Sequence, residues 1–292
     1  MSVGIVTDST CYLPAEVVSE LGIEVVPLQV ISNGVAFNEV GGITVDEVAT
    51  ALRSGKSVTT SRPNPEVFVE AFEKLHRAGH DSVISVHLSS ELSGTYESAV
   101  LASRKVDFPV DVVDSRGIAM MLGFAVQAGA KLANSGGSHA DVLDLIQRKC
   151  AGASIIFYVD SLEFLEKGGR VTAMQAKMGA SMNLKPLLHM INGKVEQQEL
   201  VRSSEKSIAR MIEIVVAAAR IKSEIAVHHV EALEAANSVA EQIRNITGVD
   251  SISVTSAGAV VGTHVGPGAL AVVVSPQVLS AHKNQSVRIS QT

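Results

Sequence analysis

Val3-Gly4-Ile5-Val6-Thr7-Asp8-Ser9-Thr10, near the start of the chain, decides the fold class. Its apolar half, residues 3–6, has the length and composition of a buried strand, and its polar half begins where that strand should end. Pro14 then stands where the first turn of a helix should begin, and Gly22 where that helix should end. A buried strand followed directly by a capped helix predicts an α/β fold.

The same alternation of strand and helix continues to about residue 150. Further strands are expected at Val25–Ile31, Val83–Val86 and Val110–Val113, and further helices at Val45–Leu52, Pro65–Ala78 and Thr95–Ser103. Strands that alternate with helices in this way predict a parallel sheet with helices on both faces. We therefore expect residues 1–150 to form one α/β domain.

The pattern changes after residue 150, where a hairpin interrupts the alternation. Asn192-Gly193 separates two strand candidates, and Asn-Gly is the strongest short hairpin signal. The expected elements are strands at Ser154–Val159, Leu187–Ile191, Lys194–Val201, Glu224–His229, Ser251–Thr255 and Ala269–Val274, and helices at Ser204–Lys222 and Ala232–Ile246. A hairpin plus β-α-β units predicts a second α/β domain with a mixed sheet over residues 151–280, packed closely on the first, and a loose polar tail over 281–292.

The composition is aliphatic and acidic. The 292 residues are 46% hydrophobic and 3% aromatic, with no Trp, so the core must consist mainly of Val, Ile, Leu, Ala and Met. Such a core can line a cavity for an alkyl chain, but it is also ordinary for an alanine-rich enzyme. The net charge of −6 and the lack of a Lys/Arg cluster exclude a nucleic-acid partner.

Several features indicate a cytoplasmic protein. Cys11 and Cys150 are far apart and lack a CxxC context, which is typical of free thiols in a reducing compartment. The chain opens directly into a strand, with no signal segment. The most apolar helical stretch, Gly117–Ala133, contains Gln127 and Lys131 and is too short to span a bilayer. We expect no stable insertion into a membrane.

Polar residues follow three of the expected parallel strands. Asp8, the segment Ser89–Thr95 and the pair Asp114-Ser115 each come directly after an apolar run. Ligands of parallel sheets bind beyond the carboxyl ends of the strands, so these residues should gather at one edge. Within the second segment, Ser93-Gly94-Thr95 leads into a helix. Its backbone N–H groups either bind an anion or are merely capped.

Two other polar segments suit a carboxylate. Thr59-Thr60-Ser61 supplies three hydroxyls, which either cap the helix near Pro65 or hydrogen-bond a ligand. Gly262-Thr263-His264-Val265-Gly266-Pro267-Gly268 is expected to be a glycine-lined loop that presents His264. The pair Gly168-Gly169 is typical of a helix end, and Arg170 after it could contact a phosphate or a partner.

Catalytic and metal motifs are weak. A hydrolase could pair Ser93 with His264, but the nucleophile elbow G-x-S-x-G is missing and no acid can be assigned to the imidazole. No P-loop or dinucleotide fingerprint occurs, and we expect no cofactor. His228 and His229 are adjacent on an expected strand, so their rings point to opposite faces and cannot chelate one metal ion. They are more typical of ordinary surface or core histidines.

Taken together, these segments resemble the DegV family of bacterial fatty-acid-binding proteins. The resemblance is carried, nearly end to end, by Thr7-Asp8-Ser9-Thr10, Thr60-Ser61-x-Pro63, Ser89-Ser90-x-Leu92-Ser93-Gly94-Thr95-Tyr96, Val113-Asp114-Ser115, Leu165-x-x-Gly168-Gly169-Arg170-Val171, Lys185-Pro186, Val201-Arg202 and Gly262–Gly268. It implies a two-domain protein, with an N-terminal three-layer α/β/α domain and a C-terminal α/β domain. It also implies that one long-chain fatty acid is bound between or within these domains.

The resemblance also implies a function without catalysis. Members act as the acyl-carrying subunit of bacterial fatty acid kinase. A separate ATP-using subunit phosphorylates the bound acid to acyl phosphate, which feeds phospholipid synthesis. A stand-alone Ser/His acyl hydrolase or transferase remains the alternative.

Carried over by motif, the fatty-acid carboxylate is expected at Thr60, Ser61, Ser93, Gly94, Thr95, His264 and Arg202. Arg170 is expected at the rim, facing the kinase or the transferred phosphate. The resemblance leaves open whether Thr60 or Ser61 contacts the carboxylate. The chain departs from the family pattern at Arg62, at Asn64 and at Cys11-Tyr12, and Arg62 could alter the charge near the head group. The preferred chain length and unsaturation stay open, because they depend on which aliphatic residues reach the cavity.

Overall fold

The computed structural model describes residues 2–172, 184–219 and 222–277, and it has the expected α/β fold. The strands are β1 Val3–Asp8, β2 Glu24–Val26, β3 Gln29–Ser32, β4 Val35–Asn38, β5 Val58–Ser61, β6 Ser82–His87, β7 Val110–Asp114, β8 Ser154–Tyr158, β9 Lys185–Ile191, β10 Lys194–Val201, β11 Ser223–His229, β12 Ile252–Ser256 and β13 Leu270–Pro276. The helices are α1 Ala15–Leu21, α2 Val45–Arg53, α3 Pro65–Arg77, α4 Thr95–Ser103, α5 Met120–Asn134, α6 His139–Gly152, α7 Glu163–Lys167, α9 Ser204–Ala218, α10 Leu233–Thr247 and α11 Ala259–Val265.

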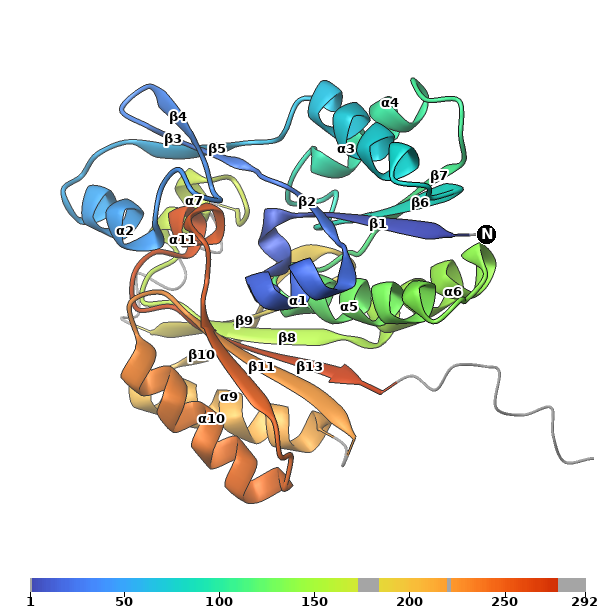
Figure 1. Cartoon of the computed structure of the whole chain (residues 1–292). Coiled ribbons are helices and arrows are strands. Elements are labelled where there is room, and N and C mark those ends of the chain that lie inside the picture. The colour runs from blue at the N-terminus through green and yellow to red at the C-terminus, as the bar shows by residue number, and fades with distance from the viewer. Residues whose placement is uncertain (1, 173–183, 220–221, 278–292) are drawn as a thin grey trace, which may run out of the picture.

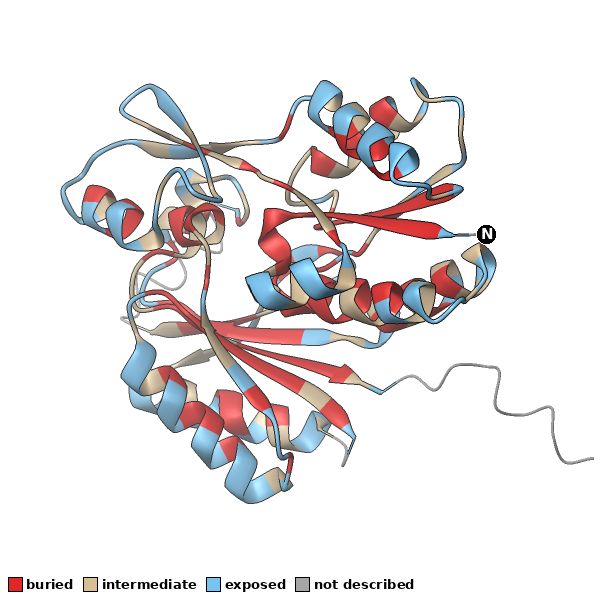
Figure 2. Ribbon diagram, in the orientation of Figure 1, coloured by how far each residue is buried: buried red, intermediate tan, exposed pale blue. Residues whose placement is uncertain are grey.

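A four-stranded parallel sheet, ordered β2-β1-β6-β7, forms the centre of the N-terminal part. Helices α3 and α4 cover one face, and α1, α5 and α6 lie on the other (Figure 1). Because both faces are covered, all residues of β1 and β6 are buried, as Figure 2 shows. The prediction of a parallel sheet between helices is confirmed.

The C-terminal part contains a six-stranded mixed sheet, ordered β10-β9-β8-β13-β11-β12. Only β11 and β12 pair in parallel among these described strands. Asn192 and Gly193 join β9 to β10 with φ angles of 51° and 84°, the left-handed pair that a two-residue hairpin needs. The predicted mixed sheet and its hairpin are confirmed.

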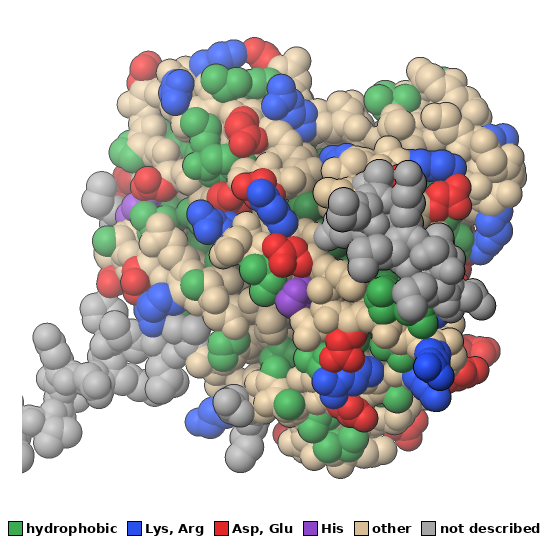
Figure 3. Space-filling model, turned by 180° about the vertical axis from the view of Figure 1, so that it is seen from behind, with side chains coloured by type: hydrophobic (Ala, Val, Ile, Leu, Met, Phe, Trp, Pro, Cys, Tyr) green, Lys and Arg blue, Asp and Glu red, His purple; other side chains and the backbone are tan. Residues whose placement is uncertain are grey.

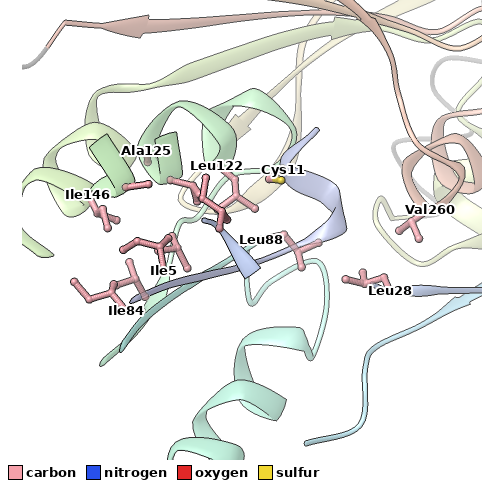
Figure 4. Packing of buried hydrophobic residues seen from close by; sticks show 14 of the residues in the cluster. Ile5, Cys11, Leu28, Ile84, Leu88, Leu122, Ala125, Ile146 and Val260 are labelled. Atoms are coloured by element: carbon pink, nitrogen blue, oxygen red, sulfur yellow. The ribbon is translucent and has the colours of Figure 1, made fainter. Parts of the chain in front are cut away.

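The two sheets share a layer of helices. Helix α5 packs on β1 with one side and on β13 with the other, while α9 and α10 cover the far face of the six-stranded sheet (Figure 1). Leu122 and Ala125 of α5 join Ile5 and Ile84 of the four-stranded sheet in one core (Figure 4). Phe124 of the same helix packs in the core of the other sheet. The parts are therefore joined through a common core layer and not by a linker.

A small antiparallel sheet, ordered β4-β3-β5, was not predicted, and it corrects one expected element. Val25–Ile31 was expected to be one strand, but Pro27 lacks the N–H that a continuous ladder needs, and the segment divides into β2 and β3 in different sheets. Asn33 and Gly34, with φ angles of 51° and 79°, close the β3–β4 hairpin. This second Asn-Gly pair is the sequence signal that indicates the β3–β4 hairpin, and it was overlooked.

The small sheet brings residues 28–61 to the C-terminal part. Helix α11 packs against α2, β3, β5 and α7, and these elements lie side by side in Figure 1. Leu28 and Val260 belong to the same core as Ile5, and Figure 4 shows them at the end of that core nearest α11. The helix expected at Ser204–Lys222 ends earlier, at Ala218, because the backbone of Ala219 is extended. Residues 220–221 lie outside the described part. The expected loose tail 281–292 also lies outside the described residues.

Candidate functional site

His264 lies on a helix and not in the loop that its glycines suggested. The helix α11 runs through Gly262, where a Cβ would clash with Val45 of α2, so glycine permits the close packing of the two helices. The helix ends at Gly266, whose φ of 74° and N–H bond to the Gly262 carbonyl terminate it. The imidazole therefore projects from the last turn of a helix held by long-range packing.

Thr60 on β5 meets this imidazole. The distance between Thr60 Oγ1 and His264 Nε2 is 2.9 Å. The other ring nitrogen, Nδ1, is buried without a hydrogen-bond partner among the described residues, and it lies against Gly168, where a Cβ would clash with it. The ring is thus fixed by a close glycine on one side and by one hydroxyl on the other.

The electrostatic environment keeps His264 neutral. Burial, with a smaller contribution from the positive charge of Arg170, lowers the pKa of His264 from 6.5 to about 4. At neutral pH the imidazole therefore has one N–H donor and one acceptor nitrogen. It can transmit a hydrogen bond, but it does not supply a positive charge.

The polar residues that follow three parallel strands gather at one sheet edge, as predicted. Asp8 Oδ2 accepts from Leu88 N at 2.9 Å, and Ser90 Oγ donates to Asp114 Oδ2 at 2.6 Å. Ser89 Oγ donates to the Gly193 carbonyl at 2.7 Å, which ties this edge to the β9–β10 hairpin. These bonds hold the segment that leads to Ser93.

Ser93 and Gly94 stand at the N-terminus of α4. Gly94 is the N-cap residue, and no side chain caps this helix end. The Ser93 and Thr95 hydroxyls lie 2.9 Å apart and bond each other. The orphan N–H groups at this end of α4 and the positive end of its dipole favour an anion.

Two arginines add positive charge beside these hydroxyls. Arg170 donates from Nε and Nη2 to the Leu92 carbonyl, at 3.0 and 2.7 Å, and from Nη1 to the Gly168 carbonyl. Arg62 is exposed and donates to the Gly94 carbonyl at 3.4 Å. Partial burial lowers the pKa of Arg170, although a guanidinium stays protonated at neutral pH.

These groups border a cavity of about 200 Å³ between the two sheets. Its apolar wall includes Leu28, Leu88, Ile155, Phe157, Met190 and Val260. Its polar lining includes Thr60, Ser61, Ser93, Gly94, Arg170 and His264. An apolar chamber with a group of hydrogen-bond donors on one part of its wall suits an amphipathic molecule with an acceptor head group.

Two of the expected site residues do not line this cavity. Thr95 is buried, and its hydroxyl is bonded to Ser93. Arg202 follows β10 and is exposed. Of the two neighbouring hydroxyls, Thr60 faces the imidazole, whereas Ser61 Oγ donates to the Arg62 carbonyl at 3.2 Å.

Glu39 was not predicted as a site residue from the sequence. It supports His264 indirectly, through the N-terminus of the helix that carries it. Its Oε1 accepts from Val260 N, in the first turn of α11, at 2.9 Å, and its Oε2 accepts from Ser9 Oγ. Burial raises the pKa of Glu39. A carboxylate 221 residues away along the chain therefore holds the N-terminus of the helix that carries His264. No local pattern around Glu39 indicates this.

The Ser93–His264 pair of a hydrolase is not formed. His264 bonds Thr60 and Ser93 bonds Thr95. A Ser-His-Asp constellation occurs elsewhere: His87 lies 2.6 Å from Ser85 Oγ and 3.1 Å from Asp8 Oδ2. All three residues have no exposed surface, so no substrate can reach them. This constellation stabilises the parallel sheet.

His228 also lines the cavity, as does His229. Burial lowers the pKa of His228 to about 4, and its two ring nitrogens meet Thr255 Oγ1 at 2.8 Å and Met120 N at 3.4 Å. Because the backbone N–H donates to Nε2, the proton lies on Nδ1 and goes to Thr255. Both nitrogens are therefore satisfied within the protein, and the prediction of ordinary core histidines fits His228.

Other classes of site find no support in the described residues. Within 2–172, 184–219 and 222–277, no three His, Cys, Asp or Glu side chains form a metal-binding group. The same ranges contain no helix long and apolar enough to cross a bilayer. Cys11 and Cys150 are free. On the face shown in Figure 3, basic and acidic side chains are interspersed.

Comparison with known proteins places this geometry in a family. A profile described as "Uncharacterised protein, DegV family" matches residues 2–277. A DegV domain-containing protein of Streptomyces coelicolor is 44% identical over 275 residues, which cover 94% of this chain and 98% of that protein.

Two solved structures have the same fold. A DegV family protein from Thermus thermophilus, described by its fatty acid binding, superimposes with a TM-score of 0.89 at 31% identity, covering 95% of this chain and all of the other. The fatty acid binding protein DegV from Bacillus subtilis has a TM-score of 0.86 at 31% identity, with the same coverage.

Proposed function

The chain belongs to the DegV family, and from this premise we propose that it binds one long-chain fatty acid in the cavity between its four-stranded and six-stranded sheets. The observation that carries the proposal is the division of the cavity lining into an extended apolar wall and a group of hydroxyls beside a neutral imidazole. Two relatives of the same fold are described as binding fatty acids.

The tail supplies most of the affinity in this proposal. Burying about fifteen methylenes at roughly 0.8 kcal/mol each contributes about 12 kcal/mol before the costs of association. The wall of Leu28, Ile155, Phe157 and Met190 offers no polar group that a tail would desolvate. The head group then has only to be satisfied and oriented.

Thr60 contacts the carboxylate directly, and His264 acts through it. A carboxylate accepts hydrogen bonds and cannot donate them, so Thr60 Oγ1 must donate its only hydrogen to the ligand. His264 Nε2 must then carry the ring proton and donate to Thr60. Ser93 Oγ and the N–H groups at the start of α4 supply the remaining donors.

The bound acid is presented to a separate ATP-dependent kinase subunit, which phosphorylates it to acyl phosphate for phospholipid synthesis in the cytoplasm. Arg170 contacts the transferred phosphate or the kinase. Its bonds to the Leu92 and Gly168 carbonyls use three of the five guanidinium N–H groups, so that, within the described part of the chain, one donor is left on each terminal nitrogen. No catalytic residue of this chain is required.

Native mass spectrometry of the full chain, purified without added lipid, tests the binding step. We expect a copurified mass equal to that of a long-chain fatty acid, and exchange with added palmitate or oleate. A clean apo mass with no uptake of either acid contradicts the proposal.

The transfer step needs a second assay. A fatty acid kinase subunit from a DegV-containing bacterium, supplied with labelled ATP, should form acyl phosphate on the loaded protein. Arg170→Ala should reduce phosphorylation by a larger factor than palmitate uptake, and Arg202→Ala, at an exposed arginine that does not line the cavity, is the matched control. Equal losses in the two variants contradict the role of Arg170.

A further inference from the structure

The cavity between the sheets has a neighbour on the other side of Tyr12. A groove of about 710 Å³ runs past α1, β2 and the end of α3. Among the described residues, Tyr12 is the single one that lines both the cavity and this groove. The Tyr12 side chain is therefore the common wall of two hollows.

The ring of Tyr12 is held from both sides. On the cavity side it meets the His228 ring edge-on, with ring centroids 5.8 Å apart and planes at 61°. On the groove side its hydroxyl donates to Glu39 Oε1 at 3.4 Å. Gly258 makes room for this arrangement, because a Cβ there would clash with both the tyrosine ring and the Glu39 carboxylate.

The backbone of Tyr12 shows that this placement is constrained. Its φ is 49°, in the left-handed region that a bulky residue rarely adopts. It ends a 3-10 turn, Ser9–Cys11, that Asp8 caps through Thr10 N. The strained residue is thus set by the end of β1 and aimed between the two hollows.

Tyr12 stands away from the head-group residues along α11. It packs at Gly258, at the start of this helix, whereas His264 is in its last turn. Val260 and His264 both line the cavity and differ by about 6 Å in rise along the axis. A ligand whose carboxylate is at Thr60 therefore meets Tyr12 with its tail and not with its head.

Beyond the ring, the groove continues the apolar surface. Leu13, Val18, Ile23, Val25 and Leu75 line it, and Lys74 and Glu24 form an ion pair at its edge with Nζ and Oε2 2.6 Å apart. A tail that passed the ring would bury further methylenes against these side chains.

We infer that Tyr12 is a specificity-determining residue, whose ring closes the tail cavity against this groove and thereby limits the length of the acyl chain. The inference rests on the proposed function, since the ligand is the fatty acid bound at Thr60. The residues of the family motifs do not determine which chain length is preferred. The inference is that Tyr12 sets this limit.

The test compares two substitutions of different kinds in the full chain. Tyr12→Gly removes the ring and suits the left-handed backbone, and Tyr12→Phe keeps the ring and loses only the hydroxyl bond to Glu39. Dissociation constants of delipidated protein are measured for palmitate, stearate, arachidate and behenate, by competition against a fluorescent fatty acid. The parent should have an optimum in this series, and longer acids should bind more weakly.

Tyr12→Gly should move the optimum by two carbons or more toward longer acids, because each additional methylene that enters the groove gains about fourfold in affinity. Tyr12→Phe should keep the parent optimum. A folded Tyr12→Gly protein with the parent optimum overturns the inference, and so does an equal shift in Tyr12→Phe. Should Tyr12→Gly not fold, Tyr12→Asn tests the same point, since asparagine also tolerates this backbone.

Two readouts separate this inference from the proposed function. A parent protein that binds none of the four acids overturns the proposed function and the inference with it. A parent that binds them, with no shift in the ring-deleted variant, overturns only the role of Tyr12. A crystal structure of Tyr12→Gly should show the cavity and the groove joined, and an intact partition would contradict the inference without reference to any ligand.

Discussion

Of the histidines that meet a hydroxyl, His87 in the parallel sheet and His264 beside the cavity make an instructive comparison. His87 lies between Ser85 and Asp8 with no exposed surface, and both of its ring nitrogens have partners. His264 meets Thr60 with one nitrogen, while the other has no partner among the described residues. Thr60 and His264 line a cavity, whereas His87 does not.

The comparison shows that residue types alone do not identify a site. The buried set, Asp8, His87 and Ser85, has the composition of a catalytic triad, yet its hydrogen-bonding capacity is used within the fold. The pair Thr60 and His264 keeps unused hydrogen-bonding capacity, because His264 Nδ1 has no partner among the described residues. Access and unused hydrogen-bonding capacity, more than residue identity, separate a binding site from a structural network.

The largest expected effect is on stability, at the buried set. Asp8 accepts from Thr10 N, Thr10 Oγ1, His87 Nδ1 and Leu88 N, so Asp8→Ala leaves several buried donors unpaired. We expect a loss of about 3–5 kcal/mol in the free energy of unfolding, measured by urea denaturation. Asp8→Asn, which keeps one acceptor oxygen, should lose less. Undiminished stability of Asp8→Ala would break the comparison.

The next effect is on binding, at the cavity set. Thr60→Val keeps the shape of the side chain and removes its donor, and a hydrogen bond to a charged group contributes about 1.5–3 kcal/mol. Palmitate affinity should fall about ten- to hundredfold in a competition assay. Stability should fall less than in Asp8→Ala, because only the His264 N–H loses its acceptor. Ser61→Ala is the control, since that hydroxyl donates to the Arg62 carbonyl. An equal loss in Ser61→Ala would refute the assignment to Thr60.

A smaller effect on both stability and binding is expected at Glu39, because this residue stabilises the fold and also positions the helix that carries His264. Glu39→Ala removes the acceptor of Val260 N and should loosen the start of α11, with a loss of about 1–2 kcal/mol in stability. Palmitate affinity of the folded variant should also fall, by about fivefold, because His264 is less well placed. Glu39→Gln keeps an acceptor oxygen and should restore most of the affinity. An affinity equal to that of the parent in Glu39→Ala would reduce Glu39 to a structural residue.

The last prediction concerns the pH dependence of stability, and its effect is smallest near neutral pH. The pKa of His264 is about 4 in the folded protein and near 6.5 when unfolded. Between these values the unfolded chain takes up a proton that the folded protein does not, so stability is complete above pH 6.5 and declines as the pH falls toward 4. Urea unfolding at pH 7, 6 and 5 should show a shallower decline in His264→Gln than in the parent. Equal slopes would indicate that His264 is not held neutral.

Local signals predicted most of the fold. The alternation of strands and helices, the ends of α1 at Pro14 and Gly22, and the Asn192-Gly193 hairpin depend on residues adjacent in sequence. Two expected elements were wrong, the strand Val25–Ile31 and the loop around His264. The first depends on a local signal that was overlooked, and the second depends on residues that are distant in the sequence. Pro27 divides a strand-like run, and the glycine-rich segment around His264 is helical because Val45 and Glu39 pack against it.

The candidate site was predicted in part. Six of the residues that the motif resemblance assigned to the site border the cavity: Thr60, Ser61, Ser93, Gly94, Arg170 and His264. Arg202 is exposed and does not line the cavity, and Thr95 is bonded to Ser93. Tyr12 and Glu39 act through contacts with α11, which no spacing in the sequence reveals.

By itself the sequence determined an α/β fold with a parallel and a mixed sheet, because strand and helix periodicities and turn residues are encoded locally. The tertiary structure alone decided that Thr60 meets His264 across 204 residues, and that Asp8, His87 and Ser85 form a closed network with no role for a ligand. The physical reason is that burial and hydrogen-bond satisfaction depend on which distant segments pack together. The same pair of groups, an imidazole and a hydroxyl, can therefore stabilise a sheet in one place and line a cavity in another.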